Sequence, residues 1–380
     1  MRGMTILPCQ RDAFAIPRDV HYFNCGYMGP LPVAASAAVA AGGALKASPW
    51  TYRASDFFTH IEAYRSRAAR LYGSTPDDVA LVPSASYALA IAAKNLPLAR
   101  GQNVVVLGEQ FPSNYYVWTT KADAVGASIR VAWRDADDDW TAAVLANIDA
   151  DTAVVAVPHC HWADGRLVDL VAVGAACRAV GAALVLDLTQ SLGALPFDVA
   201  AVQPDFAVAA GYKWQLAPYG TAMFYVSPRW HDGEPIEWNW LNRAGSQDFS
   251  RLSEFTNAYQ PGARRFDFGE CANPPLLMGA GVSLDLIDGW GVANIAATLG
   301  QRTEAIAAAA QALGLAAAPS TKRAPHFLSL SFGAAVPDGL LDRLAAAQVF
   351  VSVRGTSLRV TPHLFNDDVD VAALLAALAG

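Results

Sequence analysis

The sequence PDFAVAAGYKWQLAPYGTAMFYV, residues 204–226, places a single lysine between two apolar runs. Residues 206–210 are small and apolar, and residues 221–226 are apolar and aromatic, as is typical of buried strands. Lys213 lies between the runs, after Gly211 and before a Pro-Tyr-Gly turn. Burial would lower the pKa of this lysine and favour the neutral amine, which is the form that makes Schiff bases. The alternative is a loop lysine whose ammonium group reaches water.

Short apolar runs precede this stretch and alternate with segments of helical pattern. Strands are expected at 79–84, 103–108, 128–133, 152–157, 183–188 and 206–210. Helices are expected at about 32–46, 55–71, 85–96, 113–125, 140–147 and 168–180. Continuous apolar strands between helices indicate a largely parallel sheet that is covered on both faces. The sequence therefore predicts an α/β fold.

The pattern changes after Trp230. Residues 237–255 are polar and aromatic without a clean period, which is expected of a long loop around a site. Helices at about 275–287, 292–313 and 338–347, with strands in HFLSLSF, VFVSVR and SLRVTP, indicate a smaller α+β unit. The predicted organisation is an N-terminal arm at 1–30, a large α/β domain at 31–256 and a small C-terminal α+β domain at 257–380.

Composition excludes several classes of partner. The formal net charge of −7 and the absence of a basic run argue against nucleic-acid binding. Five cysteines without CxxC spacing favour free thiols in a reducing compartment. The start of the chain lacks a signal-peptide pattern, and the apolar stretches are too short for a membrane span. We therefore expect a cytoplasmic protein without membrane contact.

In open parallel sheets, ligands bind beyond the carboxyl ends of the strands. Ser86 follows the first strand, where a helix N-terminus suits a phosphate; the alternative is an ordinary helix N-cap. Phe111 follows the second strand and either stacks on a planar ring or belongs to the core. His159 and His161 follow the fourth strand, but without a third histidine nearby no metal site is expected.

Asp187 ends the fifth strand. A carboxylate there must be hydrogen-bonded or paired to stay charged; the alternative role is a helix cap. An aspartate, a later lysine, a phosphate-binding turn and a stacking aromatic residue are the parts that a pyridoxal phosphate site needs. The sequence therefore favours pyridoxal 5'-phosphate as the cofactor.

The motifs YFNCGYMGPLP, DLTQSLG, AGYKW, GARRFDFGECANP and LRVTPHLFN span nearly the whole chain. With them the chain resembles the class V aminotransferase superfamily of fold type I pyridoxal phosphate enzymes. This superfamily includes cysteine desulfurases, kynureninases and isopenicillin N epimerase-like proteins. The resemblance implies a large domain with a mostly parallel sheet and a smaller C-terminal α+β domain.

The resemblance also implies residue roles. Lys213 would hold the cofactor covalently and move the Cα proton, and Asp187 would keep the ring nitrogen protonated. The other implied cofactor contacts are Gln190 and His159 near the ring oxygen, Phe111 on the ring, and Tyr212, Ser86 and the Ala85 backbone at the phosphate. His159 is included with Lys213 and Asp187 among the catalytic residues.

Further implied roles concern the partner subunit and the substrate. Asn273 resembles the residue that reaches the phosphate of a partner subunit, which implies a homodimer. Arg359 is preferred over Arg354 as the residue that binds the α-carboxylate of the substrate, and Asn24 is expected to contact the substrate.

An amino acid or amine is the expected substrate, and aminotransferase is the expected activity. The alternatives are a kynureninase-like or cysteine C–S lyase, an epimerase, or a non-catalytic binding protein. No cysteine follows Cys271, which argues against persulfide transfer by a loop of the small domain.

Overall fold

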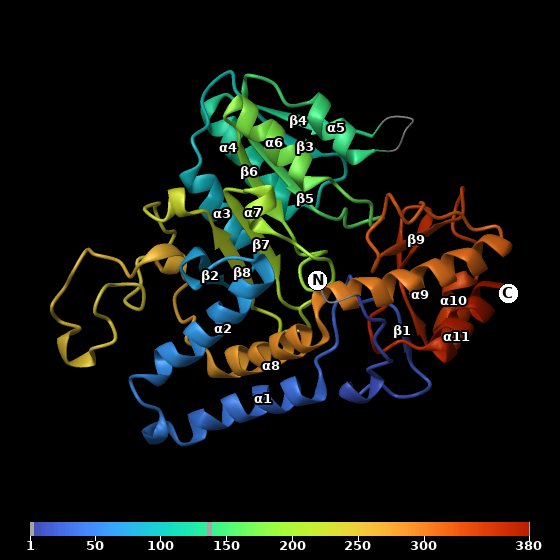
Figure 1. Ribbon diagram of the computed structural model, residues 1–380, viewed down its shortest axis with the longest axis horizontal. Helices are drawn as coiled ribbons and strands as arrows, with labels where there is room; N and C mark the ends of the chain where they lie inside the picture. Colours follow the sequence, from blue (N-terminus) through green and yellow to red (C-terminus); the bar gives the residue numbers. More distant parts are fainter. Residues whose placement is uncertain (1–3, 135–138, 380) are drawn as a thin grey trace.

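The structure is a computed structural model that describes residues 4–134 and 139–379. Within these residues a seven-stranded sheet forms the centre of the molecule, in the order β2-β8-β7-β6-β5-β3-β4 (Figure 1). The strands are β2 (Val79–Val82), β3 (Asn103–Leu107), β4 (Ser128–Ala132), β5 (Thr152–Pro158), β6 (Ala183–Asp187), β7 (Phe206–Ala210) and β8 (Ala222–Val226). The strands from β7 to β4 are parallel, whereas β8 is antiparallel to both of its neighbours. The predicted α/β fold is confirmed.

Helices cover both faces of this sheet because its strands are apolar on both faces. On β3, Val104 and Val106 face the core beneath α3 (Ala85–Asn95) and α4 (Ser113–Val125). Val105 and Leu107 face the opposite core, which includes α2 (Asp56–Tyr72) and α6 (Leu170–Val180). This alternation along one strand produces two cores. The short helices α5 (Trp140–Ala146) and α7 (Val199–Val202) lie among the connections that follow β4 and β6.

Two long helices extend the large unit below the sheet. The helix α1 (Val33–Ala44) packs along α8 (Pro274–Trp290), and α8 packs against α2 (Figure 1). A Cβ atom at Gly42 would lie 2.6 Å from the backbone nitrogen of Pro275, so this close helix contact requires glycine. The next helix, α9 (Val292–Ala312), turns away from α8 by 74°.

In the described part of the chain no single helix has the length and hydropathy of a membrane span; α8 and α9 meet that test only as a bent pair. The cytoplasmic location stays a prediction.

The C-terminal part has its own sheet and core. In the described residues a three-stranded antiparallel sheet, in the order β11-β12-β9, packs with α9 and two further helices. Its elements are β9 (Leu328–Ser331), α10 (Leu340–Ala346), β11 (Ser352–Arg354), β12 (Ser357–Val360) and α11 (Asp368–Ala379). Because α8 packs on α1 and α2, we propose that this unit begins near Gly291, whereas the boundary at residue 257 remains the prediction from sequence.

The N-terminal arm joins the two parts. Its strand β1 (His21–Tyr22) pairs in parallel with β10 (Val349–Phe350). The neighbouring Phe23 is fully buried in the C-terminal core, whereas Cys25 is buried in the core of the large unit. The arm therefore passes between the two units in an ordered path.

A buried ion pair fixes the segment before α8. The Arg65 guanidinium on α2 donates to both carboxylate oxygens of Asp267, at 3.2 and 2.6 Å, and to the carbonyl of Val79. The same carboxylate accepts from the Leu81 N–H at 2.8 Å. Asp267 thereby connects α2, β2 and the segment that leads into α8.

Short 3-10 helices complete the secondary structure. They lie at Arg11–Ala13, Leu45–Ala47, Pro49–Thr51, Pro76–Asp78, Pro228–Trp230, Phe249–Arg251 and Gly262–Phe266.

Candidate active site

A cavity lies where β5, β6 and β7 end, at Pro158, Asp187 and Ala210. This is the edge of a parallel sheet at which ligands bind. The residues that line the cavity come from the segments that follow these three strands and from those that follow β2 and β3. They are Pro83, Ser84, Ala85, Ser86, Gln110, Phe111, Ser113, Cys160, Trp162, Thr189, Gln190, Tyr212, Lys213, Tyr219, Gly220 and Thr221.

Lys213 is buried in this cavity, with 6% of its surface exposed. Its Nζ lies 5.6 Å from the ring centroid of Phe111 and 5.5 Å from that of Tyr212. Burial lowers the pKa of Lys213 to about 8, the charge of Asp187 opposes this, and the charges of Arg359 and Arg354 add to it. The lysine can therefore exist as a neutral amine near neutral pH.

Asp187 lies at the bottom of the same cavity, 8% exposed. Its Oδ1 accepts the Thr189 N–H at 3.0 Å, and its Oδ2 makes no hydrogen bond within the described residues. Thr189 is itself fixed, because its Oγ1 accepts the Ala210 N–H at 3.1 Å. Asp187 is thus held by a turn and keeps a free acceptor in the cavity.

In the turn before α3 the N-cap is Ser84, so Ser86 is left free of that role and its contact with a phosphate stays a prediction. Ser84 is the N-cap, since its Oγ accepts the Tyr87 N–H at 3.2 Å. Ser86 lines the cavity, with its Oγ 2.9 Å from that of Ser84. Because the first N–H groups of a helix bind anions, this turn suits a phosphate.

Phe111 is not a core residue. Its side chain is 38% exposed, lines the cavity and meets the ring of Trp162 edge-on at 5.6 Å between centroids. Its position beside Lys213 agrees with a ring-stacking role.

His159 lies apart from the Lys213 cavity, so its expected role near the ring oxygen stays a prediction. His159 does not line the Lys213 cavity; it lines a second cavity and packs against the ring of Phe197. Successive residues of an extended segment point to opposite sides, so Cys160 and Trp162 line the Lys213 cavity instead. Cys160 and Trp162 were not predicted as lining residues, because the sequence after β5 carries no signal for which side each residue faces.

Gln190 lines the cavity, yet both ends of its amide have protein partners. Its Nε2 donates to the Gly26 carbonyl and its Oε1 accepts from the Trp214 indole, each at 3.0 Å. Its carbonyl accepts from Nε2 of His326 at 2.6 Å. Gln190 therefore connects the arm, the Lys213 loop and the segment before β9, and its contact with a ring oxygen stays a prediction.

The arm packs directly on the Lys213 loop. The Gly29 N–H donates to the Tyr212 carbonyl at 2.8 Å, and the Cys25 thiol lies 3.7 Å from the Lys213 carbonyl. Asn24 lies farther along the arm, where its Oδ1 accepts from the Ser352 hydroxyl at 2.7 Å. Asn24 does not line the cavity, so its role toward a substrate stays a prediction.

We expect Gly29→Ala to displace this contact. A Cβ atom at Gly29 would lie 2.1 Å from the Lys213 carbonyl oxygen, which is shorter than any tolerated contact. The loop or the arm must move, and overpacking of this kind costs about 1–3 kcal/mol. The midpoint temperature of thermal unfolding and the affinity for the cofactor should both fall. The control is Gly43→Ala, where a Cβ atom meets nothing within 4 Å; equal behaviour of the two variants would contradict the prediction.

Asn273 is the N-cap of α8, and its side chain accepts the Leu276 N–H at 3.2 Å. It lines a smaller cavity that shares Gly220 and Thr221 with the Lys213 cavity. Its contact with a partner subunit stays a prediction.

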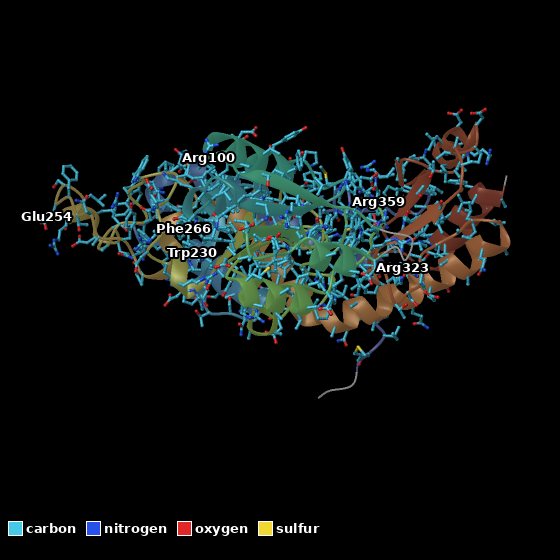
Figure 2. The ribbon with its side chains drawn as sticks, turned by 90° about the horizontal axis from the view of Figure 1, so that it is seen from above. Arg100, Trp230, Glu254, Phe266, Arg323 and Arg359 are labelled. Atoms are coloured by element: carbon cyan, nitrogen blue, oxygen red, sulfur yellow. The ribbon has the colours of Figure 1, made fainter. Side chains whose placement is uncertain are left out.

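The aromatic segment 237–255 does not surround the Lys213 cavity. Trp238 and Trp240 line a separate depression together with Phe255. Figure 1 shows this segment projecting from the end of the molecule opposite the C-terminal unit, and Figure 2 shows Glu254 at its outer tip. The long loop was predicted from the sequence, but the prediction that it surrounds the site is wrong for this cavity.

Arg359 is buried at the junction of the two units (Figure 2). Its Nη1 donates to the Trp162 carbonyl at 2.9 Å. Burial and the charge of Arg354 lower the pKa of Arg359 to about 10. Among the described residues no cluster of three or more metal-binding side chains occurs.

Residues 45–364 match the family model named aminotransferase class-V. The chain belongs to the class-V aminotransferase family. It is 29% identical over 320 residues to the uncharacterized aminotransferase YcbU of Bacillus subtilis, covering 80% of this chain and 79% of that protein. It is 28% identical over 240 residues to the kynureninase of Pseudomonas fluorescens, covering 59% of this chain and 56% of the kynureninase.

Solved structures confirm the fold. A C-DES mutant with glycine covalently linked to its PLP cofactor superposes with a TM-score of 0.88 at 20% identity, covering 97% of this chain and 99% of C-DES. The apo cysteine desulfurase of Thermococcus onnurineus superposes with a TM-score of 0.84 at 17% identity, covering 99% of this chain and 98% of the desulfurase. At these identities the likeness shows the fold alone, which is fold type I.

The family is one of enzymes with pyridoxal phosphate as cofactor, and the residues of the cavity fit that group. Lys213 supplies an amine for its aldehyde, and Asp187 has a free acceptor for a protonated ring nitrogen. The start of α3, with Ser86, suits the phosphate, and Phe111 suits the ring.

Proposed function

We propose that this protein is an aminotransferase that acts at the Cα atom of an amino acid or amine. The observation that carries the proposal is a buried lysine with a lowered pKa in one cavity with a carboxylate that keeps a free acceptor. The family membership and the relative YcbU support the same class of reaction. Lyases belong to the same family, so the reaction type is what the experiment must decide.

Each residue of the cavity has a defined task in this proposal. When bound, pyridoxal phosphate withdraws electrons from the Cα atom of the substrate. Lys213 would hold the cofactor through its amine and would take and return the Cα proton of the substrate, for which a pKa near the working pH is favourable. Asp187 would keep a proton on the ring nitrogen, and Phe111 and Trp162 would shield the reacting atoms from water.

The visible absorption of the holoenzyme tests the proposal. Amino acids are added one at a time without any keto acid. A transaminase loses the visible absorption when one equivalent of amino acid has reacted per active site. It regains the absorption when a keto acid is added. Absorption that persists while ammonia or sulfide accumulates would identify a lyase and contradict the proposal.

The pKa of Lys213 predicts how cofactor capture depends on pH. Protonated lysine does not attack an aldehyde, so the capture rate should rise about tenfold per pH unit below pH 8 and level off above it. Stopped-flow absorbance of the apoprotein from about pH 6 to about pH 10 measures the profile. The reaction of Nα-acetyl-lysine corrects for ionisation of the cofactor itself. A midpoint near 10.5, the ordinary lysine value, would contradict the prediction.

We also propose that the protein is a homodimer. Tyr27, Met28 and Tyr219 are exposed beside the cavity, and Met28 and Tyr219 line an apolar depression with Leu31 and Pro218. A second copy would cover this surface, as the resemblance of the Asn273 segment also implies. Sedimentation equilibrium should give a dimer, and Tyr219→Glu should shift it toward the monomer. A wild-type monomer would refute the proposal.

A further inference from the structure

The hairpin of β11 and β12 presents two arginines on one face. Its antiparallel register pairs Ser352 with Arg359 and Arg354 with Ser357. Directly opposed residues share a face, and neighbours along a strand alternate. Ser352, Arg354, Ser357 and Arg359 therefore lie on one face, whereas the fully buried Leu358 points into the C-terminal core. The shared face contains two guanidinium groups and no acid.

Neither arginine has a carboxylate partner in the described residues. Arg359 is 2% exposed and donates only to neutral acceptors, the Trp162 carbonyl at 2.9 Å and the Ser352 hydroxyl at 3.4 Å. Arg354 donates to the carbonyl of Val353 at 2.7 Å. The Nε atoms of both arginines are buried without an acceptor. A buried charge that lacks a counter-charge is costly.

The other deeply buried arginines of the described chain differ in this respect. Arg65 is paired with Asp267 at 2.6 Å, and Arg323 with Glu304 at 2.8 Å. The fold therefore supplies acids where a buried arginine serves structure. Arg359 has the same burial without an acid, which points to an anionic ligand as its partner.

Both arginines adjoin the Lys213 cavity through Trp162. Arg359 donates to the carbonyl of Trp162, the Arg354 guanidinium lies 5.4 Å from the Trp162 ring centroid, and Trp162 lines the cavity. The charges of both arginines contribute to the lowered pKa of Lys213. A single carboxylate would leave one of the two guanidinium groups uncompensated.

We propose that the substrate is an α-amino acid with a second acidic group, a carboxylate or sulfinate, on its side chain. Arg359, which is the more deeply buried and is held by Trp162 and Ser352, binds the α-carboxylate. Arg354 lies next to the Gly355 turn and binds the side-chain acid. Diagonal positions of a hairpin are roughly 7–8 Å apart, which separates the two acids by a short carbon chain. This inference rests on the proposed function, because it assigns a substrate class to the same site.

Isothermal titration of the holoenzyme with two unreactive acids of equal chain length tests it. Glutarate has two carboxylates and valerate has one. We expect glutarate to bind at least about tenfold more tightly, the effect of one charge-assisted bidentate pair. Arg354→Gln should remove most of this advantage, and Arg354→Lys should retain part of it. The control is Arg343→Gln on the exposed side of α10, which should retain the full advantage.

Two outcomes would overturn the inference. Equal affinity for glutarate and valerate would show that no second acid site exists. If Arg354→Gln lowered the affinity for glutarate and for valerate by the same factor, the two arginines would share one carboxylate. Failure of the proposed function would look different, because acid binding requires no reaction: the visible cofactor absorption would be absent or unresponsive to amines while the calorimetric preference remained.

Discussion

Lys213→Ala is expected to lower kcat/KM by about 10²–10⁴, the usual contribution of a positioned acid–base group, and to remove covalent attachment of the cofactor. Lys213 is the lysine of the cavity, and burial gives its amine a pKa of about 8. Borohydride reduction followed by mass spectrometry should find the cofactor on Lys213 in the wild type and nowhere in the variant.

The exposed Lys46 provides a matched control for this experiment. Lys46→Ala should retain activity and labelling, because its ammonium group is already in water. Wild-type activity in Lys213→Ala would refute the assigned role of the lysine. Circular dichroism of the variant separates loss of chemistry from loss of fold.

Asp267→Ala is expected to lower the free energy of unfolding by about 3–5 kcal/mol. The substitution leaves the fully buried Arg65 guanidinium without its charged partner and leaves the Leu81 N–H without its acceptor. Chemical denaturation monitored by tryptophan fluorescence measures the change.

Asp285→Ala is the control for this prediction. Asp285 forms an equally close ion pair with Arg67, at 2.6 Å, but its side chain is half exposed. Exposed pairs of this kind contribute less than about 1 kcal/mol. Similar losses in the two variants would show that burial does not determine the effect of Asp267.

The sheet could be predicted because its strands carry a local signal. Residues 206–210 are small, apolar and fully enclosed, and the predicted strand coincides with β7. The same local pattern singled out Asp187, which ends β6, and Lys213, which lies shortly after β7. The order of the strands is not local, and nothing in the sequence indicated that β8 would separate β7 from β2.

The features of the site that could not be predicted have physical causes. After β5 the choice between His159 and Cys160 depends on the phase of an extended segment, and a shift by one residue exchanges the two sides. The pairing of the arm with β10 was not predicted, because β1 is only two residues long and β10 lies more than 300 residues away. Such pairing leaves no periodic pattern to detect.

The path of the arm has a consequence for biosynthesis. Asn24 bridges to Thr361, and Gly29 rests on the Lys213 loop. A ribosome adds about 5–20 residues per second, so the arm leaves the exit tunnel on the order of 20 to 70 s before its partner strand is made. The lysine loop is made part-way through this interval, and from then until Val349 is added, on the order of 7 to 27 s, it lacks a wall on one side. Nascent chains that stop before residue 349 should therefore fail to retain the cofactor, although their central sheet is already complete.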